Sequence, residues 1–167
     1  LKNVVIPETV TEIKSFAFAD CFELASVIIP DSVTSLGAKA FYNCTSLESV
    51  KLSKEITLIG GYTFYNCSSL KNIVIPDKVI TINDYAFAGC TNLENVKISN
   101  SVTAIGKSVF SNTNLKSITI PSNVTGIGAN TFYNCNNLKT ITINKEANSI
   151  EGSPWGATNV EEIIWEE

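Results

Sequence analysis

The sequence predicts a solenoid, mainly β, in which units of about 23 residues stack in a right-handed array. Three observations predict this fold class. A leucine recurs at a nearly fixed interval, the apolar residues follow the same order in each unit, and proline and glycine recur at fixed places. One unit cannot bury its own apolar face, so several units must stack to form a core. The right-handed sense follows from the usual rule for parallel crossover connections.

The leucine interval defines the units. Five leucines, from Leu1 to Leu93, follow one another in steps of 23 residues, and two later steps measure 22. The chain therefore forms one predicted domain over residues 1–167, with seven units and a partial eighth. The units begin at residues 1, 24, 47, 70, 93, 115 and 138, and the partial unit begins at 160.

The second unit shows the predicted elements in order. Val27 and Ile29 have the two-residue period of a strand, and Pro30 follows where a ladder ends because proline lacks an N–H. Residues 33–37 predict a second short strand or an extended turn. Residues 40–44 are too few for a full helix, so we expect one helical or 3₁₀ turn there. The strands of successive units then form a parallel sheet on one face of the stack.

One position of the unit is aromatic along almost the whole chain. Six of the eight phenylalanines occupy it, and a tryptophan continues the column. A binding site does not need one ring per unit, so the column predicts a buried spine of the core. The members of the spine are Phe18, Phe41, Phe64, Phe87, Phe110, Phe132 and Trp155.

A second column holds all five cysteines. Their spacing equals the repeat and differs from the C-x₂-C spacing of many metal sites, so it predicts a ladder of small buried thiols. Thiols of neighbouring units are close enough for disulfides, and this alternative stays open. The fifth unit is one residue shorter and lacks the cysteine. The members of the column are Cys21, Cys44, Cys67, Cys90 and Cys135.

Glycine occupies a third column, at Gly37, Gly60, Gly106 and Gly128, with Asn83 in the fourth unit. Glycine and asparagine both tolerate positive φ, so this column predicts a tight corner. None of these glycines begins the Gly-Lys-Ser/Thr sequence of a phosphate loop.

The composition excludes several classes of function. The chain has no histidine, which excludes serine–histidine and cysteine–histidine catalytic pairs and histidine metal sites. A net charge of −4 argues against nucleic acid as a partner. The sequence contains no apolar run of about 18 residues, so it predicts no membrane-spanning segment. We therefore expect no catalytic residues, no metal, no cofactor and no enzymatic activity. The absence of methionine, including at position 1, indicates an excised piece or a processed product.

The outward residues of the main strands form the candidate binding face, called the strand face below. They are small polar or β-branched, with Lys51 and Lys97 as cations in an otherwise uncharged column. A protein partner is one interpretation, and a solvated sheet face without a partner is the other. An adjacent column often alternates in charge, as at Glu48 and Lys71, which predicts ion pairs across the sheet. The strand face comprises Asn3, Val5, Ser26, Ile28, Ser49, Lys51, Asn72, Val74, Asn95, Lys97, Ser117, Thr119, Thr140 and Thr142.

The tyrosines form a second candidate surface, the aromatic stripe, in the predicted turns away from the main strands. Such side chains either anchor a partner or stack on their neighbours and cover the turns. The strand face has no aromatic platform, which favours a protein over a glycan, but the stripe keeps a glycan as an alternative. The stripe comprises Tyr42, Tyr62, Tyr65, Tyr85 and Tyr133.

The unit L-x-x-V-x-I-P-x-x-V-x-x-I-G-x-x-A-F-x-x-C resembles the leucine-rich repeat of BspA-like surface proteins, also called the treponemal type. The best copies are residues 24–46, 70–92 and 115–137. The resemblance implies a leucine-rich repeat solenoid that forms part of a longer secreted or cell-surface protein. The third and fifth units depart from the unit with Ser53 and Ser99 in place of proline, which predicts local loosening.

The resemblance also implies a function. BspA-like proteins are linked with adhesion to host proteins or other cells, and their repeat supplies no catalytic motif. We therefore expect a non-catalytic module for protein–protein binding, with a host extracellular or surface protein as partner. The alternative is a structural spacer that holds other modules of a larger surface protein away from the cell.

Overall fold

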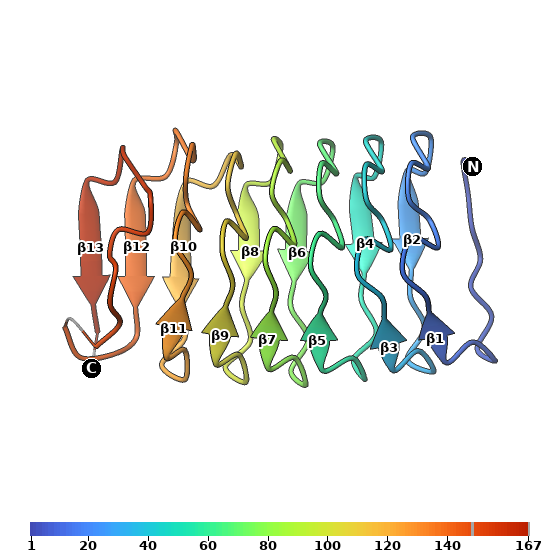
Figure 1. Ribbon diagram of the computed structural model, residues 1–167, viewed down its shortest axis with the longest axis horizontal. Coiled ribbons are helices and arrows are strands. Elements are labelled where there is room, and N and C mark those ends of the chain that lie inside the picture. Colours follow the sequence, from blue (N-terminus) through green and yellow to red (C-terminus); the bar gives the residue numbers. More distant parts are fainter. Residues whose placement is uncertain (148, 167) are drawn as a thin grey trace.

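The computed structural model describes residues 1–147 and 149–166. The units lie side by side along one axis, and the main strands from β2 to β10 are each followed by a short second strand (Figure 1). The main strands are β2 (Ser26–Ile28), β4 (Ser49–Lys51), β6 (Asn72–Val74), β8 (Asn95–Lys97), β10 (Ser117–Ile120), β12 (Thr140–Ile143) and β13 (Glu162–Trp165). The second strands are β1 (Glu12–Ile13), β3 (Ser35–Leu36), β5 (Leu58–Ile59), β7 (Thr81–Ile82), β9 (Ala104–Ile105) and β11 (Gly126–Ile127).

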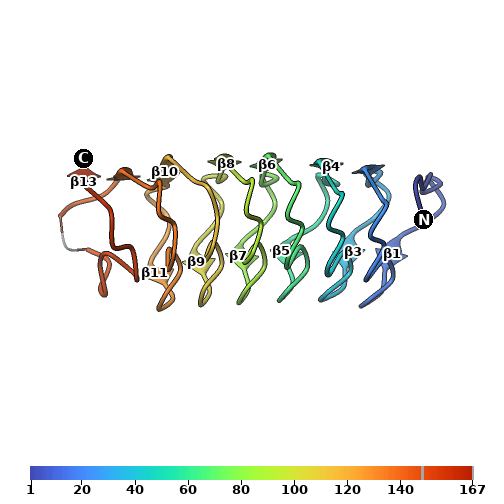
Figure 2. The ribbon, with the colours of Figure 1, turned by 90° about the horizontal axis from the view of Figure 1, so that it is seen from above.

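Every pairing between these strands is parallel and joins equivalent positions of successive units. Ile73 lies opposite Val96, for example, and Ile82 lies opposite Ile105. The main strands follow one long side of the molecule and the second strands face away from it (Figure 2). The predicted parallel solenoid with a spacing of about 23 residues is confirmed.

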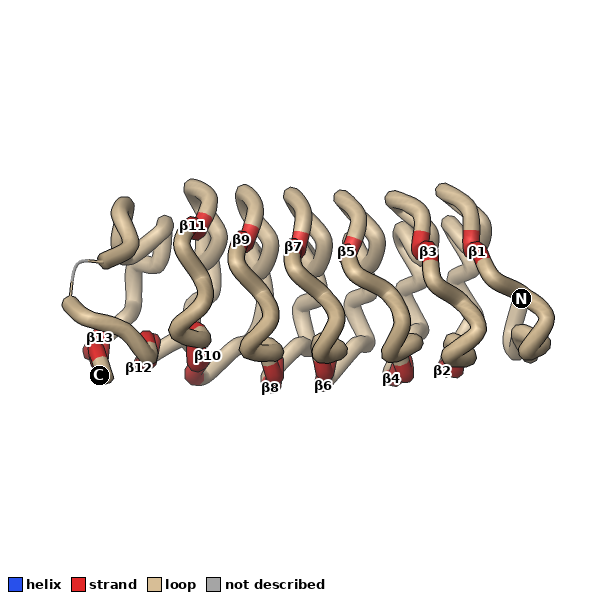
Figure 3. The backbone as a smooth tube through the Cα atoms, turned by 90° about the horizontal axis from the view of Figure 1, so that it is seen from below, coloured by secondary structure: helices blue, strands red, loops and turns tan. Residues whose placement is uncertain are grey.

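The predicted helical or 3₁₀ turn is wrong, and the second short strand is right. The segments around the spine phenylalanines are turns, and the described residues contain no helix (Figure 3). Two residues with positive φ flank each ring; Lys39 (58°) and Asn43 (57°) flank Phe41. Left-handed residues cannot continue a right-handed helix, so the chain turns twice within five residues.

The spine is confirmed as the centre of the core. Consecutive phenylalanine rings stack nearly parallel with centroids 5.2–6.2 Å apart. Trp155 is buried at the end of the column and meets Phe132 edge-on at 6.3 Å. All members are buried except Phe18, which is half-buried.

The glycine column does not adopt the positive φ that the sequence suggests. None of its four glycines has a φ between +20° and +160°. The reason for glycine is instead the close approach of the neighbouring unit. A Cβ on Gly37 would stand 2.3 Å from the backbone nitrogen of Ser15, and one on Gly128 would stand 2.4 Å from that of Lys107.

The cysteine column is a ladder of thiols, and all five cysteines are free. The Cys67 Sγ donates to the Phe41 carbonyl of the preceding unit at 3.2 Å, and the Cys44, Cys90 and Cys135 thiols bond in the same way. The fifth unit keeps this position, because Thr113 fills it and donates to the Phe110 carbonyl at 2.8 Å. The missing residue of that unit therefore lies after the column.

The main strands do not form one continuous sheet. They form three ladders, β2–β4, β6–β8 and β10–β12–β13. The ladder stops after β4 and after β8, the strands that Ser53 and Ser99 follow in place of proline. The loosening predicted at these two positions is therefore an interruption of the sheet on the strand face.

Candidate functional site

The strand face is exposed where the ladders carry it. Of its fourteen residues all are exposed except Thr140 and Thr142, which are half-buried. Ile28 and Val74 are large apolar side chains with 65% and 59% of their surface exposed. The structure does not bring Asn3 and Val5 into the sheet, because the segment before β1 forms no strand (Figure 1).

A hollow of about 540 Å³ opens in the strand face where the ladder is interrupted between β4 and β6. Lys51 and Asn72 line it, Val74 lies on the β6 wall, and Lys97 reaches it from β8. Asp77 is also part of the lining, a residue that the sequence analysis did not connect with this face. A second hollow of about 460 Å³ adjoins Lys97 and Asp77 at the end of β8.

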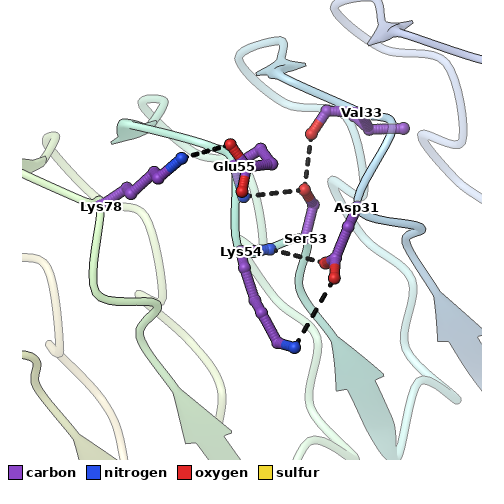
Figure 4. Close-up of polar contacts among 6 residues, drawn as sticks. All are labelled: Asp31, Val33, Ser53, Lys54, Glu55 and Lys78. Carbon is purple, nitrogen blue, oxygen red and sulfur yellow. Dashed lines mark hydrogen bonds and ion pairs between the residues drawn. The ribbon is translucent and has the colours of Figure 1, made fainter.

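Ser53 ties the third unit to the unit before it, whereas among the described residues no strand ladder joins the third unit to the fourth on the strand face. Its buried hydroxyl donates to the Val33 carbonyl of the preceding unit at 2.6 Å and accepts from the backbone N–H of Glu55 (Figure 4). In the fifth unit, the Ser101 hydroxyl reaches the Val79 carbonyl at 2.8 Å and contacts the Ser99 hydroxyl. Each serine unit is thus tied to the unit before it. The larger hollow lies on the other side of the third unit, whereas the fifth unit borders both hollows on the side that faces the fourth unit.

Ion pairs join neighbouring units along the molecule, and Glu48 and Lys54 of these pairs line the hollow. Lys71 pairs with Glu48 at 3.4 Å and Lys116 with Glu94 at 3.2 Å, so the charge alternation predicted from the sequence is confirmed at these pairs. Lys78 pairs with Glu55, and Lys54 pairs with Asp31 (Figure 4). Further along the face, Lys139 pairs with Glu161 at 2.6 Å.

Two lysines of the hollow, unlike Lys54, lack an ion-pair partner within the described residues. Neither Lys51 nor Lys97 is in an ion pair within residues 1–147 and 149–166. A hydrogen bond from the Lys54 backbone N–H, with the charges of Lys54 and Lys51, lowers the pKa of Asp31. The hollow therefore offers two unpaired cations on either side of an exposed valine, in a chain whose net charge is −4.

The aromatic stripe is a stack rather than a set of open rings. Tyr42 stacks on Tyr65 with centroids 5.2 Å apart, and Tyr62 stacks on Tyr85 at 4.8 Å. Lys39 lies over the Tyr62 ring, 5.2 Å from its centroid. Tyr133 lies apart from these stacks in the sequence and is 52% exposed. The side chains within each of the two stacks therefore cover one another.

The repeat of this chain matches that of a known protein family. The family model for the BspA type leucine rich repeat region matches residues 1–79 and 57–167, in six copies. The chain belongs to this family. The BspA-type resemblance noted from the repeat is thereby confirmed. A search of the curated proteins gives no match.

Solved structures of bacterial leucine-rich repeat proteins resemble this BspA-type chain. A leucine-rich repeat protein from Bacteroides ovatus is 30% identical over 97% of the chain, with a TM-score of 0.82. The leucine-rich repeat protein of T. pallidum is 31% identical over 81%, with a TM-score of 0.76. A leucine-rich cell surface protein from Faecalibacterium prausnitzii is 35% identical over 83%, with a TM-score of 0.64. The chain spans 48%, 66% and 44% of the lengths of these three proteins.

The described part of this BspA-type chain shows neither a metal-binding cluster nor a membrane-spanning helix. Residues 1–147 and 149–166 contain no group of three or more Cys, Asp or Glu side chains that could hold a metal ion. No helix in the same residues is long and apolar enough to cross a membrane. Burial raises the pKa of the Cys44 thiol to about 12 and also raises the pKa values of Cys67, Cys90 and Cys135. These thiols are therefore protonated at neutral pH and poor nucleophiles.

Proposed function

We propose that this chain is a non-catalytic protein-binding module of a secreted or cell-surface protein, and that adhesion to a host or neighbouring cell is its role. The hollow in the strand face carries the proposal. Lys51, Val74 and Lys97 place two unpaired ammonium groups beside an exposed apolar side chain. Such a surface suits a protein segment with carboxylates next to an apolar residue, because both charge and apolar contact are then satisfied.

The comparisons support the cellular setting of this proposal. The similar protein from F. prausnitzii is described as a leucine-rich cell surface protein. The repeat itself provides a rigid support, because backbone ladders and the stacked spine fix each strand. A rigid face loses little conformational entropy when a partner binds.

The test is a binding assay with a matched pair of variants. The 167-residue chain is immobilised, and purified extracellular-matrix and serum proteins are passed over it one at a time at low and moderate salt. The strand-face variant combines Lys51→Glu, Val74→Asn and Lys97→Glu. The control combines Lys14→Glu, Ile80→Asn and Lys107→Glu, exposed residues beside the second strands, with the same change in charge.

We expect at least one protein of the panel to bind more tightly at low salt. The strand-face variant should weaken that binding at least tenfold, because it reverses both unpaired charges, and the control should not. Unchanged binding by the strand-face variant overturns the choice of this surface. Failure of every panel protein to bind the parent chain contradicts the proposed adhesion.

The structural spacer is a second candidate, and the regular contacts between units favour it. Backbone hydrogen bonds, the spine and ion pairs all join one unit to the next. Deletion of residues 70–92 removes one whole unit together with the β6 wall of the hollow. A binding module should lose its partner on this deletion, whereas a spacer should keep every interaction of the modules that it carries.

A further inference from the structure

A notch lies outside the strand face, at the end of the aromatic stripe. It is a hollow of about 330 Å³ lined by residues that include Tyr65, Asn66, Tyr85, Gly89 and Asn112. This volume is at the lower end of the ~300–1,000 Å³ that small-molecule sites occupy. The residues come from the third, fourth and fifth units, in the turns that lead from a second strand to the next main strand.

Both stacks of tyrosines end at this notch. Tyr65 stacks on Tyr42, and one unit further along its column the residue is Ala88. Tyr85 stacks on Tyr62, and the next residue of its column is Ser108. Alanine and serine are too small to cover an aromatic ring. Each stack therefore ends with a ring face that no further ring covers, and both of these faces belong to residues of the notch.

A ladder of asparagine side chains is interrupted at the same place. The Asn66 Nδ2 donates to the Asn43 Oδ1 at 3.2 Å, and the Asn134 Nδ2 donates to the Asn112 Oδ1 at 2.9 Å. Gly89 occupies the position between Asn66 and Asn112, so the ladder lacks one amide. Within the described residues, the Asn66 Oδ1 accepts no hydrogen bond and the Asn112 Nδ2 donates none.

The notch therefore combines an uncovered ring, a free acceptor and a free donor, and no charged side chain lines it. We infer that it binds one neutral pyranose ring of a glycan. The C–H face of the sugar stacks on a tyrosine, one hydroxyl donates to the Asn66 Oδ1, and another accepts from the Asn112 Nδ2. A neutral sugar suits this chemistry because it carries both an apolar face and a ring of hydroxyls. This site is independent of the proposed protein-binding face.

The experiment is an NMR titration of the ¹⁵N-labelled 167-residue chain with glucose, galactose, mannose and N-acetylglucosamine, each added alone. We expect saturable shifts of the amide signals of Gly89, Ser111 and Asn112 with at least one sugar, and a Kd in the millimolar range. Absence of a saturable shift with all four sugars overturns the inference. If acetamide gives the shifts and the sugars do not, the notch binds amide side chains and the sugar assignment is wrong.

Two variants and a control locate the site. Gly89→Asn adds an amide at a φ of 77° that asparagine tolerates. Its Cβ would stand 2.1 Å from the Asn66 Oδ1, so the Asn66 side chain must move, and the variant should abolish the shifts. Asn112→Gly removes the donor without blocking the notch and should raise Kd at least fivefold. Asn130→Gly makes the same exchange at an exposed left-handed position outside the notch and should leave Kd unchanged. Equal Kd values for all three variants contradict the site.

Discussion

The two left-handed residues beside each spine phenylalanine determine the path of the turn. The position two residues after the ring is asparagine or aspartate in most units, as at Asp20 and Asn66, and these residues adopt positive φ more readily than most others. The position two residues before the ring holds Tyr62 and Tyr85 in the third and fourth units, and these tyrosines adopt positive φ only at a cost of about 1–2 kcal/mol. Their stacking on one another offsets part of this cost.

Removal of a spine ring should destabilise the whole chain. Phe87 is fully buried and stacks on Phe64 and Phe110, so Phe87→Ala leaves a cavity and should lower the free energy of unfolding by about 3–5 kcal/mol. Urea unfolding followed by circular dichroism measures the change. Phe16→Ala is the control, since this ring is 57% exposed and lies outside the spine; its effect should stay below about 1 kcal/mol.

The buried thiols predict a loss of stability in alkaline solution. Folding raises the pKa of Cys44 from its ordinary 9.0 to about 12, because burial disfavours the thiolate. This contribution is complete below pH 9, and between pH 9 and 12 it declines, because the unfolded chain loses its proton first. The free energy of unfolding should therefore fall more steeply above pH 9 in the parent chain than in Cys44→Thr. Threonine is the replacement that Thr113 shows in the same column. Equal slopes would falsify the assignment.

At the level of strands, short ladders and close approach between units decide the architecture. The second strands contribute two residues each, and one of these packs into the core from most of them, as Ile59 and Ile82 do. Glycine follows four of these strands, where the preceding unit leaves little space for a Cβ. The role of glycine here is steric, whereas at Gly89 it is also conformational.

Two glycines at the same strand should respond in opposite ways to alanine. A Cβ on Gly128 would stand 2.4 Å from the Lys107 nitrogen, so Gly128→Ala should cost about 1–3 kcal/mol of stability. A Cβ on Gly126 meets no atom within 4 Å, and Gly126→Ala should be neutral or stabilising by up to about 1 kcal/mol. Thermal unfolding of the two variants checks this pair. A similar loss for both contradicts the steric explanation.

The whole molecule is a nearly straight array in which each unit is held mainly by its two neighbours (Figure 2). The continuous features are the spine and the thiol ladder, both inside. The ion pairs lie outside, and their side chains are 40–73% exposed. Exposed pairs stabilise proteins weakly, by about 0–1 kcal/mol each. Stability therefore resides in the apolar columns.

High salt should leave the array folded. We expect 1 M NaCl to lower the free energy of unfolding by no more than about 2 kcal/mol, because it screens exposed pairs and does not affect the spine. Urea titrations at low and high salt measure the difference. Lys71→Met removes one pair and should cost less than about 1 kcal/mol. A collapse of stability at high salt would show that the charges hold the units together.

The sequence by itself determined the solenoid, its spacing of about 23 residues, the spine, the thiol ladder and the exposed side of the main strands. These follow from periodicity, because a residue type that recurs once per unit must occupy one place in every turn of the stack. The tertiary structure alone decided where the sheet is interrupted, why the glycines are there, and which lysines are unpaired. Such features depend on distances between neighbouring units, as Ser53 shows when it bonds to Val33. The hollow and the notch both arise where one unit departs from the repeat, and a one-dimensional pattern marks the departure without showing the space that it leaves.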